Sequence, residues 1–359
     1  MGITSLFSLP SMKILLPLAW IYGGVMAVRN WMFDNGLLSQ THFNLPVIAV
    51  GNLAVGGTGK TPHTEYILRW LSSQGRRCAM LSRGYGRKTK GFYEVRGRQP
   101  QETGDEPWQV QRKFPQVRVC VCEKRVEGIS KMLSTGAAPE VIVLDDAFQH
   151  RYVQPGLSIL LTDYSRPYYS DYVMPAGRLR EFRKGARRAQ VILVTKCPET
   201  LSDQEQKEMV HRIKPLPYQE VFFTRFVYGD LYPFSDTAEE SAMLSSSTAL
   251  LLCGIARPEN LICYLQPQCK LLEVAEFTDH HNFTKEEIEQ LAERAVHFDR
   301  VITTEKDAAR LSGYSLPQQL SERLWVQPIE VQFLNNEYKK FNKIITDYVT
   351  ENSRNSTVD

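Results

Sequence analysis

The sequence lacks several features that would place it at once in a familiar class. The formal net charge is only +3, which is too small to indicate a nucleic-acid partner by itself. The seven cysteines include no C-x-x-C pair, and no Cys/His set has the spacing of zinc ligands. We therefore expect buried free thiols in a reducing compartment and no nucleic acid. There is no internal repeat and no low-complexity segment.

The sequence also has no apolar run long enough for an ordinary membrane span. Residues 14–28 are almost wholly apolar but fall short of the ~20 residues that a spanning helix needs. No small-residue cleavage site follows, which argues against a signal peptide. Trp20 and Trp31 suit a headgroup boundary, so we expect a helix lying on the membrane surface. A buried core helix and an uncleaved anchor are the alternatives.

Short apolar segments alternate with helical patterns through the rest of the chain. This alternation predicts an α/β fold with a P-loop NTPase-like parallel sheet and helices on both faces. A second, smaller α/β domain follows a connector of β-strands bounded by prolines. The expected divisions are an apolar membrane-associating helix (1–32), a P-loop kinase domain (33–215), a β connector (216–247), a C-terminal α/β domain (248–350) and a polar tail (351–359).

A glycine-rich loop between a strand and a helix carries the clearest chemical signal. The segment "GNLAVGGTGKTP" has the Gly-Lys-Thr ending of a phosphate-binding loop, but Ala54 stands where the first glycine is usual. Glycines let backbone amides converge on phosphate oxygens, and the following helix N-terminus favours anions. Because alanine is the smallest substitute, we expect a nucleotide here. The predicted contacts are Ala54, Val55, Gly56, Gly57, Thr58, Gly59, Lys60 and Thr61.

Two adjacent aspartates follow a buried strand in "VIVLDDAFQH". Asp145 and Asp146 would lie at the carboxyl edge of the sheet, where ligands bind in open α/β folds. Adjacent carboxylates are costly to leave without a cation. Together with the hydroxyl of Thr61 they predict a Mg²⁺ site. The late strand ends in "VTKC" without the N-K-x-D of guanine-specific proteins, which weakens a GTPase interpretation and leaves a kinase favoured.

A kinase also needs a base for the acceptor hydroxyl. "GDEP" offers Asp105 and Glu106 at the start of a helix, where the residues alone favour a helix cap for Asp105. "FTDHHNF" offers Asp279 and His280 in a loop before another helix, and a histidine beside a carboxylate can be tuned as a proton acceptor. The residues alone leave the choice open.

Taken in order, "GNLAVGGTGKTP", "SRGYGR", "GDEP", "LDDAFQH", "GRLRE", "FTDHHNF" and "TTEKDA" resemble the tetraacyldisaccharide 4′-kinase family of lipid A synthesis. The resemblance runs from the apolar helix to about residue 345. Ala54 falls where the family itself departs from the general loop pattern. The usual "DDGFQH" is "DDAFQH" here, so Ala147 requires that its position in the turn not have a positive φ.

The resemblance implies ATP-dependent phosphorylation of the 4′-hydroxyl of a tetraacylated glucosamine disaccharide 1-phosphate. It implies a membrane lipid surface as partner, on the cytoplasmic face of the inner membrane of a Gram-negative cell. It makes Asp105 the base, paired with His280, with Lys60 on the phosphates and Mg²⁺ at Thr61, Asp145 and Asp146. Further substrate contacts implied or compatible with it are Arg83, Tyr85, Glu106, Arg125, Gln149, His150, Arg180, Glu181 and Asp279.

Two other hypotheses stay open at this point. A P-loop regulatory NTPase acting as a membrane-associated switch would hydrolyse nucleotide without a small acceptor. A membrane-bound scaffold with a vestigial loop would bind no nucleotide.

Overall fold

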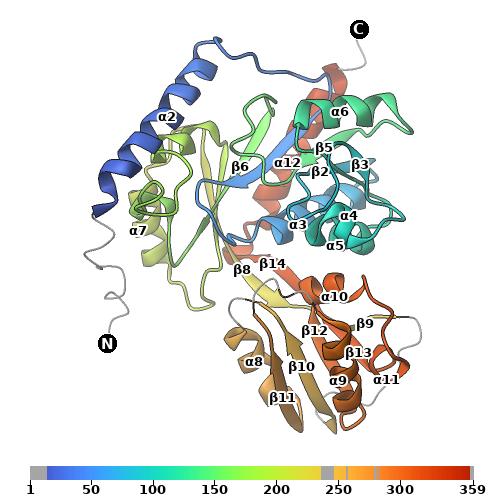
Figure 1. The fold of residues 1–359 in the computed structure, drawn as a ribbon. Helices are drawn as coiled ribbons and strands as arrows, with labels where there is room; N and C mark the ends of the chain where they lie inside the picture. Colours follow the sequence, from blue (N-terminus) through green and yellow to red (C-terminus); the bar gives the residue numbers. More distant parts are fainter. Residues whose placement is uncertain (1–13, 236–245, 256–257, 279–280, 282, 356–359) are drawn as a thin grey trace.

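The computed structural model describes residues 14–235, 246–255, 258–278, 281 and 283–355. Two sheets, each with its own helices, lie one below the other (Figure 1). The chain enters the larger sheet first, crosses to the smaller one, and returns to the larger sheet for its last strand and helix. The C-terminal helix consequently lies on the first unit.

Within the described residues the larger sheet has the strand order β14-β8-β7-β6-β1-β5-β2-β4-β3. All neighbours from β8 to β4 are parallel, and the edge strands β14 and β3 are antiparallel to theirs. The strands are β1 (Val47–Asn52), β2 (Cys78–Ser82), β3 (Tyr93–Glu94), β4 (Arg118–Val121), β5 (Val141–Leu144), β6 (Leu157–Asp163), β7 (Val191–Thr195), β8 (Glu220–Tyr228) and β14 (Ile329–Phe333).

Helices cover both faces of this sheet, which explains why its strands are continuous apolar runs. In β1, Ile48 and Val50 point into one core cluster while Val47 and Ala49 point into another on the opposite face. The helices are α2 (Leu16–Asp34), α3 (Lys60–Ser73), α4 (Pro100–Thr103), α5 (Asp105–Lys113), α6 (Arg125–Ser134), α7 (Asp203–Ile213) and α12 (Tyr338–Asn355), with 3₁₀ turns η1 (Tyr168–Ser170), η2 (Arg183–Arg188) and η5 (Leu334–Asn336).

The smaller sheet has the order β11-β10-β12-β13-β9 among the described residues, and only β9 is antiparallel to its neighbour. The predicted α/β class with a second, smaller α/β unit is therefore confirmed. Its elements are β9 (Tyr232–Pro233), β10 (Thr248–Cys253), α8 (Glu259–Leu265), η4 (Gln266–Gln268), β11 (Leu271–Glu276), α9 (Lys285–Ala295), β12 (Arg300–Thr304), α10 (Glu305–Leu311), α11 (Gln318–Ser321) and β13 (Leu324–Gln327).

The last part of the expected C-terminal domain (248–350) does not belong to the smaller sheet. Strand β14 pairs with β8 of the larger sheet, and Phe341 of α12 is buried in the core beneath that sheet. The ring of Phe341 lies 5.7 Å from that of Phe222 on β8 and 4.8 Å from that of Phe333 on β14. An amphipathic helix can be recognised from its sequence, but the sheet it covers cannot, because that choice depends on contacts distant along the chain.

The helix α2 lies along one edge of the first unit (Figure 1). Only Ala19, Gly23 and Phe33 of this helix are buried. More than half of the side-chain surface is exposed at its apolar residues Leu18, Trp20, Ile21, Val25, Val28 and Trp31, and at Ile14 just before the helix. The alternative of a buried core helix does not fit this exposure. No helix among the described residues is long and apolar enough to cross a bilayer.

The packing of α12 gives a testable prediction. Phe341→Ala should lower the free energy of unfolding by about 3–5 kcal/mol, because it leaves a cavity among large aromatic rings. Urea denaturation measures the change. Lys339→Ala, at an exposed position of the same helix, is the matched control and should stay within about 0.5 kcal/mol of the parent protein. Equal effects of the two substitutions would contradict this packing.

Candidate active site

The glycine-rich loop joins the end of β1 to the start of α3, as the sequence predicts. Gly59 has φ 84° and Gly56 has φ 110°, in a region that favours glycine. A Cβ on Gly59 would lie 2.5 Å from Cζ of Phe226, so this position excludes a side chain for a second reason. Neither Ala54 nor Ala147 is among the residues with positive φ. Both alanines therefore fit where glycine is more usual.

Side chains from three strands and from α3 hold the loop in place. The Asn52 side-chain amide donates to Oγ1 of Thr58 at 2.8 Å, and Oγ1 of Thr195 donates to the Thr58 carbonyl at 2.8 Å. Nδ1 of His63 lies 2.7 Å from the Gly59 carbonyl, and its Nε2 lies 2.9 Å from Oγ1 of Thr224. Burial lowers the pKa of His63 to about 4, so the imidazole is neutral and its Nδ1 donates. The loop is thus preformed.

The two aspartates that follow β5 have different surroundings. Asp145 is 1% exposed, and Oγ1 of Thr64 and Oγ of Ser82 donate to its two oxygens at 3.3 and 3.4 Å. Asp146 has φ 45° and its carboxylate lies 3.6 Å from Nζ of Lys60. The turn thus directs one acid inward and the other toward the loop lysine.

Burial raises the pKa of Asp145 to about 7, and the negative charges of Glu106 and Asp146 add to the shift. Lys60 and Arg125 act in the opposite direction but do not cancel it. Glu106 of "GDEP" is therefore close enough to the aspartates of "LDDAFQH" for their charges to interact. Asp146 pairs with Lys60 and Glu106 with Lys306, while hydroxyl groups donate to the buried Asp145.

Asp105 is the first residue of α5, and the second unit holds its side chain. Nε of Arg310, on α10, donates to Oδ2 of Asp105 at 3.3 Å, while the same guanidinium donates to Asp307 at 2.7 Å. Beside this pair, Nζ of Lys306 lies 3.6 Å from Oε1 of Glu106. Asp105 therefore lies at the seam between the two units, and its side chain is 39% exposed.

The motif "SRGYGR" lies directly against "GDEP". A Cβ on Gly84 would come within 2.7 Å of the Thr103 carbonyl, and one on Gly104 within 3.0 Å of the Tyr85 carbonyl. Tyr85 is 82% exposed, and Arg83 is exposed as well. These two side chains are free to meet a ligand at the seam.

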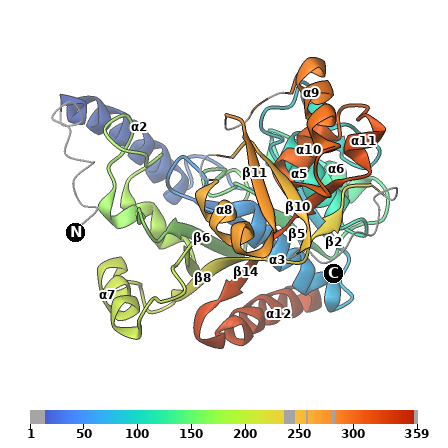
Figure 2. The ribbon, with the colours of Figure 1, turned by 90° about the horizontal axis from the view of Figure 1, so that it is seen from below.

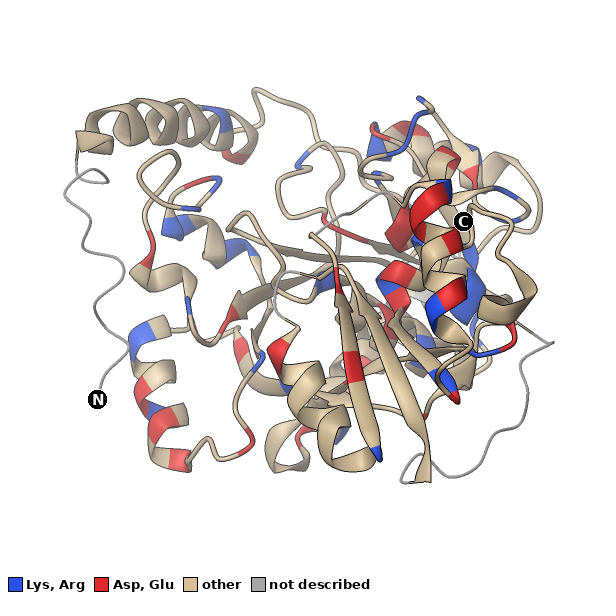
Figure 3. Ribbon diagram, turned by 60° about the horizontal axis from the view of Figure 1, so that its bottom comes forward, with Lys and Arg blue, Asp and Glu red and all other residues tan. Residues whose placement is uncertain are grey.

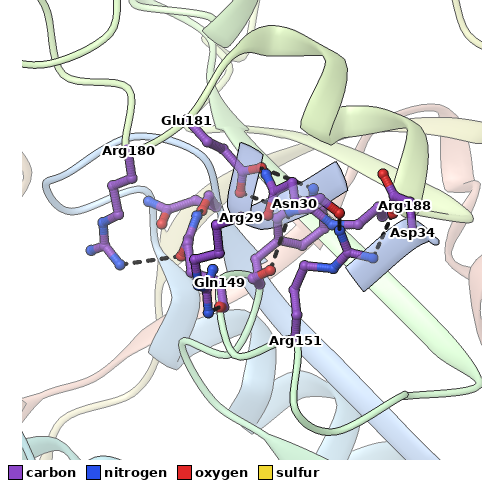
Figure 4. A network of polar contacts seen from close by, with 10 residues as sticks. Arg29, Asn30, Asp34, Gln149, Arg151, Arg180, Glu181 and Arg188 are labelled. Carbon is purple, nitrogen blue, oxygen red and sulfur yellow. Dashed lines mark hydrogen bonds and ion pairs between the residues drawn. The ribbon is translucent and has the colours of Figure 1, made fainter. Parts of the chain in front are cut away.

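A network of polar contacts joins α2 to the predicted substrate residues (Figure 4). The Asn30 amide donates to Glu181 at 2.6 Å, and Arg188 donates to both oxygens of Glu181 at 2.7 and 2.8 Å. Arg29 donates to the Gln149 carbonyl at 3.2 Å. Glu181, at 2% exposure, thus braces the N-terminal helix from a buried position.

Arg180 extends this network to the phosphate-binding loop. Its guanidinium donates to Asp146 at 3.4 Å and to Oε1 of Gln149 at 3.3 Å, and its backbone N–H donates to the Leu53 carbonyl at 2.7 Å. Gln149 in turn donates to the Asn52 carbonyl at 2.8 Å. The segment around Arg180 therefore forms one wall of the site.

Two other predicted substrate contacts are enclosed. Arg125 is 2% exposed and donates to the backbone carbonyls of Cys122 and Asp145. Burial, followed by the positive charge of Arg125, lowers the pKa of His150 to about 4. Arg125 supports the turn that carries the aspartates. Asp279 and His280 lie outside the described residues.

Several residues of this site carry no signal in the sequence. Arg310 and Lys306 meet Asp105 and Glu106 from about two hundred residues away along the chain, and "TTEKDA" contributes to the resemblance without indicating this contact. Ser82 and Thr64 reach Asp145 from β2 and α3. Only the topology, which sets β2 beside β5 and α3 above them, brings these hydroxyls together.

The buried Asp145 gives a prediction about pH. In the folded protein without nucleotide this carboxyl keeps its proton up to about pH 7, whereas the unfolded chain releases it near the ordinary value of 3.8. The stability of the folded protein therefore falls as pH rises through this window. Asp145→Asn removes the carboxyl that titrates and with it this loss of stability. The free energy of unfolding of the variant should therefore rise relative to that of the parent protein between about pH 4 and about pH 7, by at least about 1 kcal/mol.

Urea denaturation across this pH range tests the prediction. Asp230→Asn, at an exposed position between β8 and β9, is the control and should follow the parent protein at every pH. An advantage of Asp145→Asn that is constant with pH would contradict the account of the buried carboxyl.

Comparison with known proteins places the chain in a family. A family profile described as tetraacyldisaccharide-1-P 4′-kinase matches residues 11–350. A tetraacyldisaccharide 4′-kinase of Bacteroides fragilis is 44% identical over 359 residues, covering 96% of this chain and 95% of the relative. One of Flavobacterium johnsoniae is 44% identical over 341 residues, covering 95% and 98%.

A solved structure agrees with these relatives. The LpxK of Aquifex aeolicus, crystallised in complex with ATP, matches with a TM-score of 0.73 and 29% identity over 94% of this chain and 99% of that one. The regulatory-switch and scaffold alternatives are not favoured by any of these matches. The resemblance seen in the sequence is confirmed: this chain belongs to the tetraacyldisaccharide 4′-kinase family.

Proposed function

We propose that this protein transfers the γ-phosphate of ATP to the 4′-hydroxyl of a tetraacylated glucosamine disaccharide 1-phosphate. The observation that carries the proposal is the meeting of three motifs at one sheet edge: the glycine-rich loop, the aspartates after β5, and Asp105 at the start of α5. Family membership supports the acceptor, because the relatives carry its name. The ATP complex of the Aquifex aeolicus structure supports the donor.

The triphosphate would bind to the loop from Ala54 to Thr61. Backbone amides between Gly56 and Thr61 and the N-terminus of α3 favour phosphate oxygens. Nζ of Lys60 lies 3.6 Å from the Asp146 carboxylate. When the nucleotide binds, Lys60 would leave this carboxylate and contact the outer phosphates. No rearrangement of the loop is needed, because the contacts of Thr58 and Gly59 already fix it.

The residues present fit Mg²⁺. Asp145 is buried beside two further acids and its pKa is raised, so a divalent cation would stabilise the ionised carboxylate. We propose that Asp145, Asp146 and Thr61, which opens α3, hold the ion. When bound, it would neutralise charge on the transferred phosphoryl group.

For the acceptor we propose that Asp105 is the base. The 4′-hydroxyl oxygen would form a bond to the γ-phosphorus as the bond from that phosphorus to the β–γ bridging oxygen breaks, and ADP would leave. The hydroxyl proton would pass to the Asp105 carboxylate. Arg310 fixes the orientation of this carboxylate from the second unit. His280 is proposed as its partner. Arg83 and Tyr85, exposed beside "GDEP", are placed to meet the sugar or its 1-phosphate.

The acyl chains of such a substrate must stay in lipid while the sugar reaches the phosphates. We propose that the exposed apolar face of α2 lies in the surface of the membrane, on the cytoplasmic side of the inner membrane. A helix with one apolar face and no spanning length is suited to this position. Its polar side already contacts Glu181 and the Gln149 carbonyl, so the site opens close to the lipid surface.

The base assignment predicts a specific loss. Asp105→Ala should reduce phosphate transfer from ATP to the disaccharide acceptor about 10²- to 10⁴-fold, because no other group takes the proton. Transfer of radiolabelled γ-phosphate measures the rate, and calorimetry with Mg-ATP should show binding unchanged. Asp230→Ala is the control and should keep full activity. Normal turnover by Asp105→Ala would remove this residue from the role of base.

The membrane assignment predicts a separation of two properties. Replacing Trp20, Ile21 and Val25 by serine should weaken association with vesicles on the order of a hundredfold, since each side chain loses its transfer into lipid. Turnover of a short-chain, soluble acceptor should change little. In the matched control, serine replaces Leu133, Leu271 and Val296, which are exposed apolar residues outside α2. This control should bind vesicles as the parent protein does. Equal loss of vesicle binding by both triple variants would exclude α2 as the contact surface.

A further inference from the structure

A hollow lined largely by basic side chains lies between η2 and the end of α7, outside the candidate active site. It has a volume of about 580 Å³. Arg183, Lys184 and Arg187 line it from η2, and His211, Arg212 and Lys214 line it from the other side. No acidic residue is among its lining residues, and none of the residues assigned to the nucleotide, the metal or the base takes part. The net charge of the whole chain is small, but the side chains that line this hollow are strongly positive.

Among the described residues, no carboxylate pairs with the cations of this basic hollow. Arg183 donates to the backbone carbonyl of Asp171 at 2.9 Å, and Arg212 forms a hydrogen bond with the Tyr169 side chain. Within the part of the chain that the structure describes, no carboxylate forms an ion pair with any of the five lysines and arginines of the hollow. The C-terminal dipole of α7 stabilises the cations at its end. It does not account for Lys184 and Arg187, which face the same space from η2.

The hollow adjoins the proposed membrane helix. Phe182, the residue before η2, packs so closely on α2 that a Cβ on Gly23 would lie 2.5 Å from its Cζ. In Figures 1 and 2, α2 and α7 lie along the same side of the molecule. Lys and Arg gather in the segments beneath α2 in Figure 3. An apolar helix face beside unpaired cations is the combination that binds anionic lipid surfaces, by burial of apolar area and by charge.

We propose that this basic hollow binds the phosphate headgroup of an anionic phospholipid in the membrane on which α2 lies. Arginine forks match phosphate oxygens in pairs, and lysine adds charge. The proposal rests on the proposed membrane position of α2. It adds a lipid-binding site separate from the acceptor site, and it makes membrane association depend on the charge of the lipid as well as on apolar burial.

The test compares vesicles of phosphatidylcholine with vesicles that also contain phosphatidylglycerol. Parent protein should bind the anionic vesicles more tightly in a flotation assay. The variant Lys184→Gln/Arg187→Gln/Lys214→Gln should lose on the order of a hundredfold of this binding, at about fivefold for each cation near the surface. It should bind neutral vesicles as the parent protein does. These three side chains make no hydrogen bond or ion pair within the described residues, so folding should be unaffected.

The control carries the same change in net charge at other exposed sites, as Lys270→Gln/Lys285→Gln/Lys339→Gln. It should stay within about threefold of the parent protein, because those exposed lysines are not part of the basic hollow and their charges are screened. Equal loss by the two triple variants would overturn the proposal, as would parent binding that does not increase with phosphatidylglycerol.

Two further measurements separate other sources of the phosphate group. Calorimetry with inorganic phosphate should show no binding to the basic hollow, and binding lost in the Lys184/Arg187/Lys214 variant would assign a free-phosphate site instead. The KM for a soluble disaccharide acceptor should be unchanged in this variant, and an increase would assign the hollow to the substrate's 1-phosphate. An equal loss of binding to neutral and to anionic vesicles by this variant would also overturn the proposal.

Discussion

The proposed site depends on bringing acidic and basic side chains together at one edge of a parallel sheet, beside the glycine-rich loop. Asp145 is buried, Asp146 faces Lys60, and Glu106 is close enough to raise the pKa of Asp145. Burial and these neighbouring charges disfavour the ionised form of Asp145, and the preformed amides of the glycine-rich loop lie nearby. We propose that both features favour a metal–nucleotide complex, whose cation would lie near the carboxylates and whose phosphates would lie near the loop amides.

The second unit completes this arrangement from the other side of the seam. Arg310 and Lys306 of α10 contact Asp105 and Glu106 of α5. Deeper in the same seam, Nζ of Lys113 lies 2.7 Å from both Glu65 of α3 and Glu305 of α10. The helix that begins with the proposed base is therefore fixed at both ends to α10. Since Lys113 contacts α3 and α10 at once, the helix with the proposed base is tied to both units.

Much of this could be predicted from the sequence because the signals are local. A glycine-rich loop before a helix and a pair of acids after a buried strand each have one reasonable position in a parallel sheet, and the structure has both there. The mild departures at Ala54 and Ala147 proved compatible because neither needs a positive φ. Contacts between distant segments could not be predicted. Topology determines three such contacts: the hydrogen bond from Arg310 to Asp105, the hydrogen bond between α2 and Glu181, and the packing of α12 on the first sheet. The role of Arg125 could not be predicted either. The sequence suggests a substrate contact, whereas its guanidinium donates to backbone carbonyls.

The most direct measurement is a crystal structure with magnesium and a nonhydrolysable ATP analogue. The account predicts the triphosphate along the amides from Gly56 to Thr61, its terminal phosphate beside Lys60, and the carboxylate of Asp105 facing that phosphate across a gap that a sugar hydroxyl could fill. A nucleotide bound elsewhere, or an Asp105 directed away from the terminal phosphate with the two units closed, would contradict it.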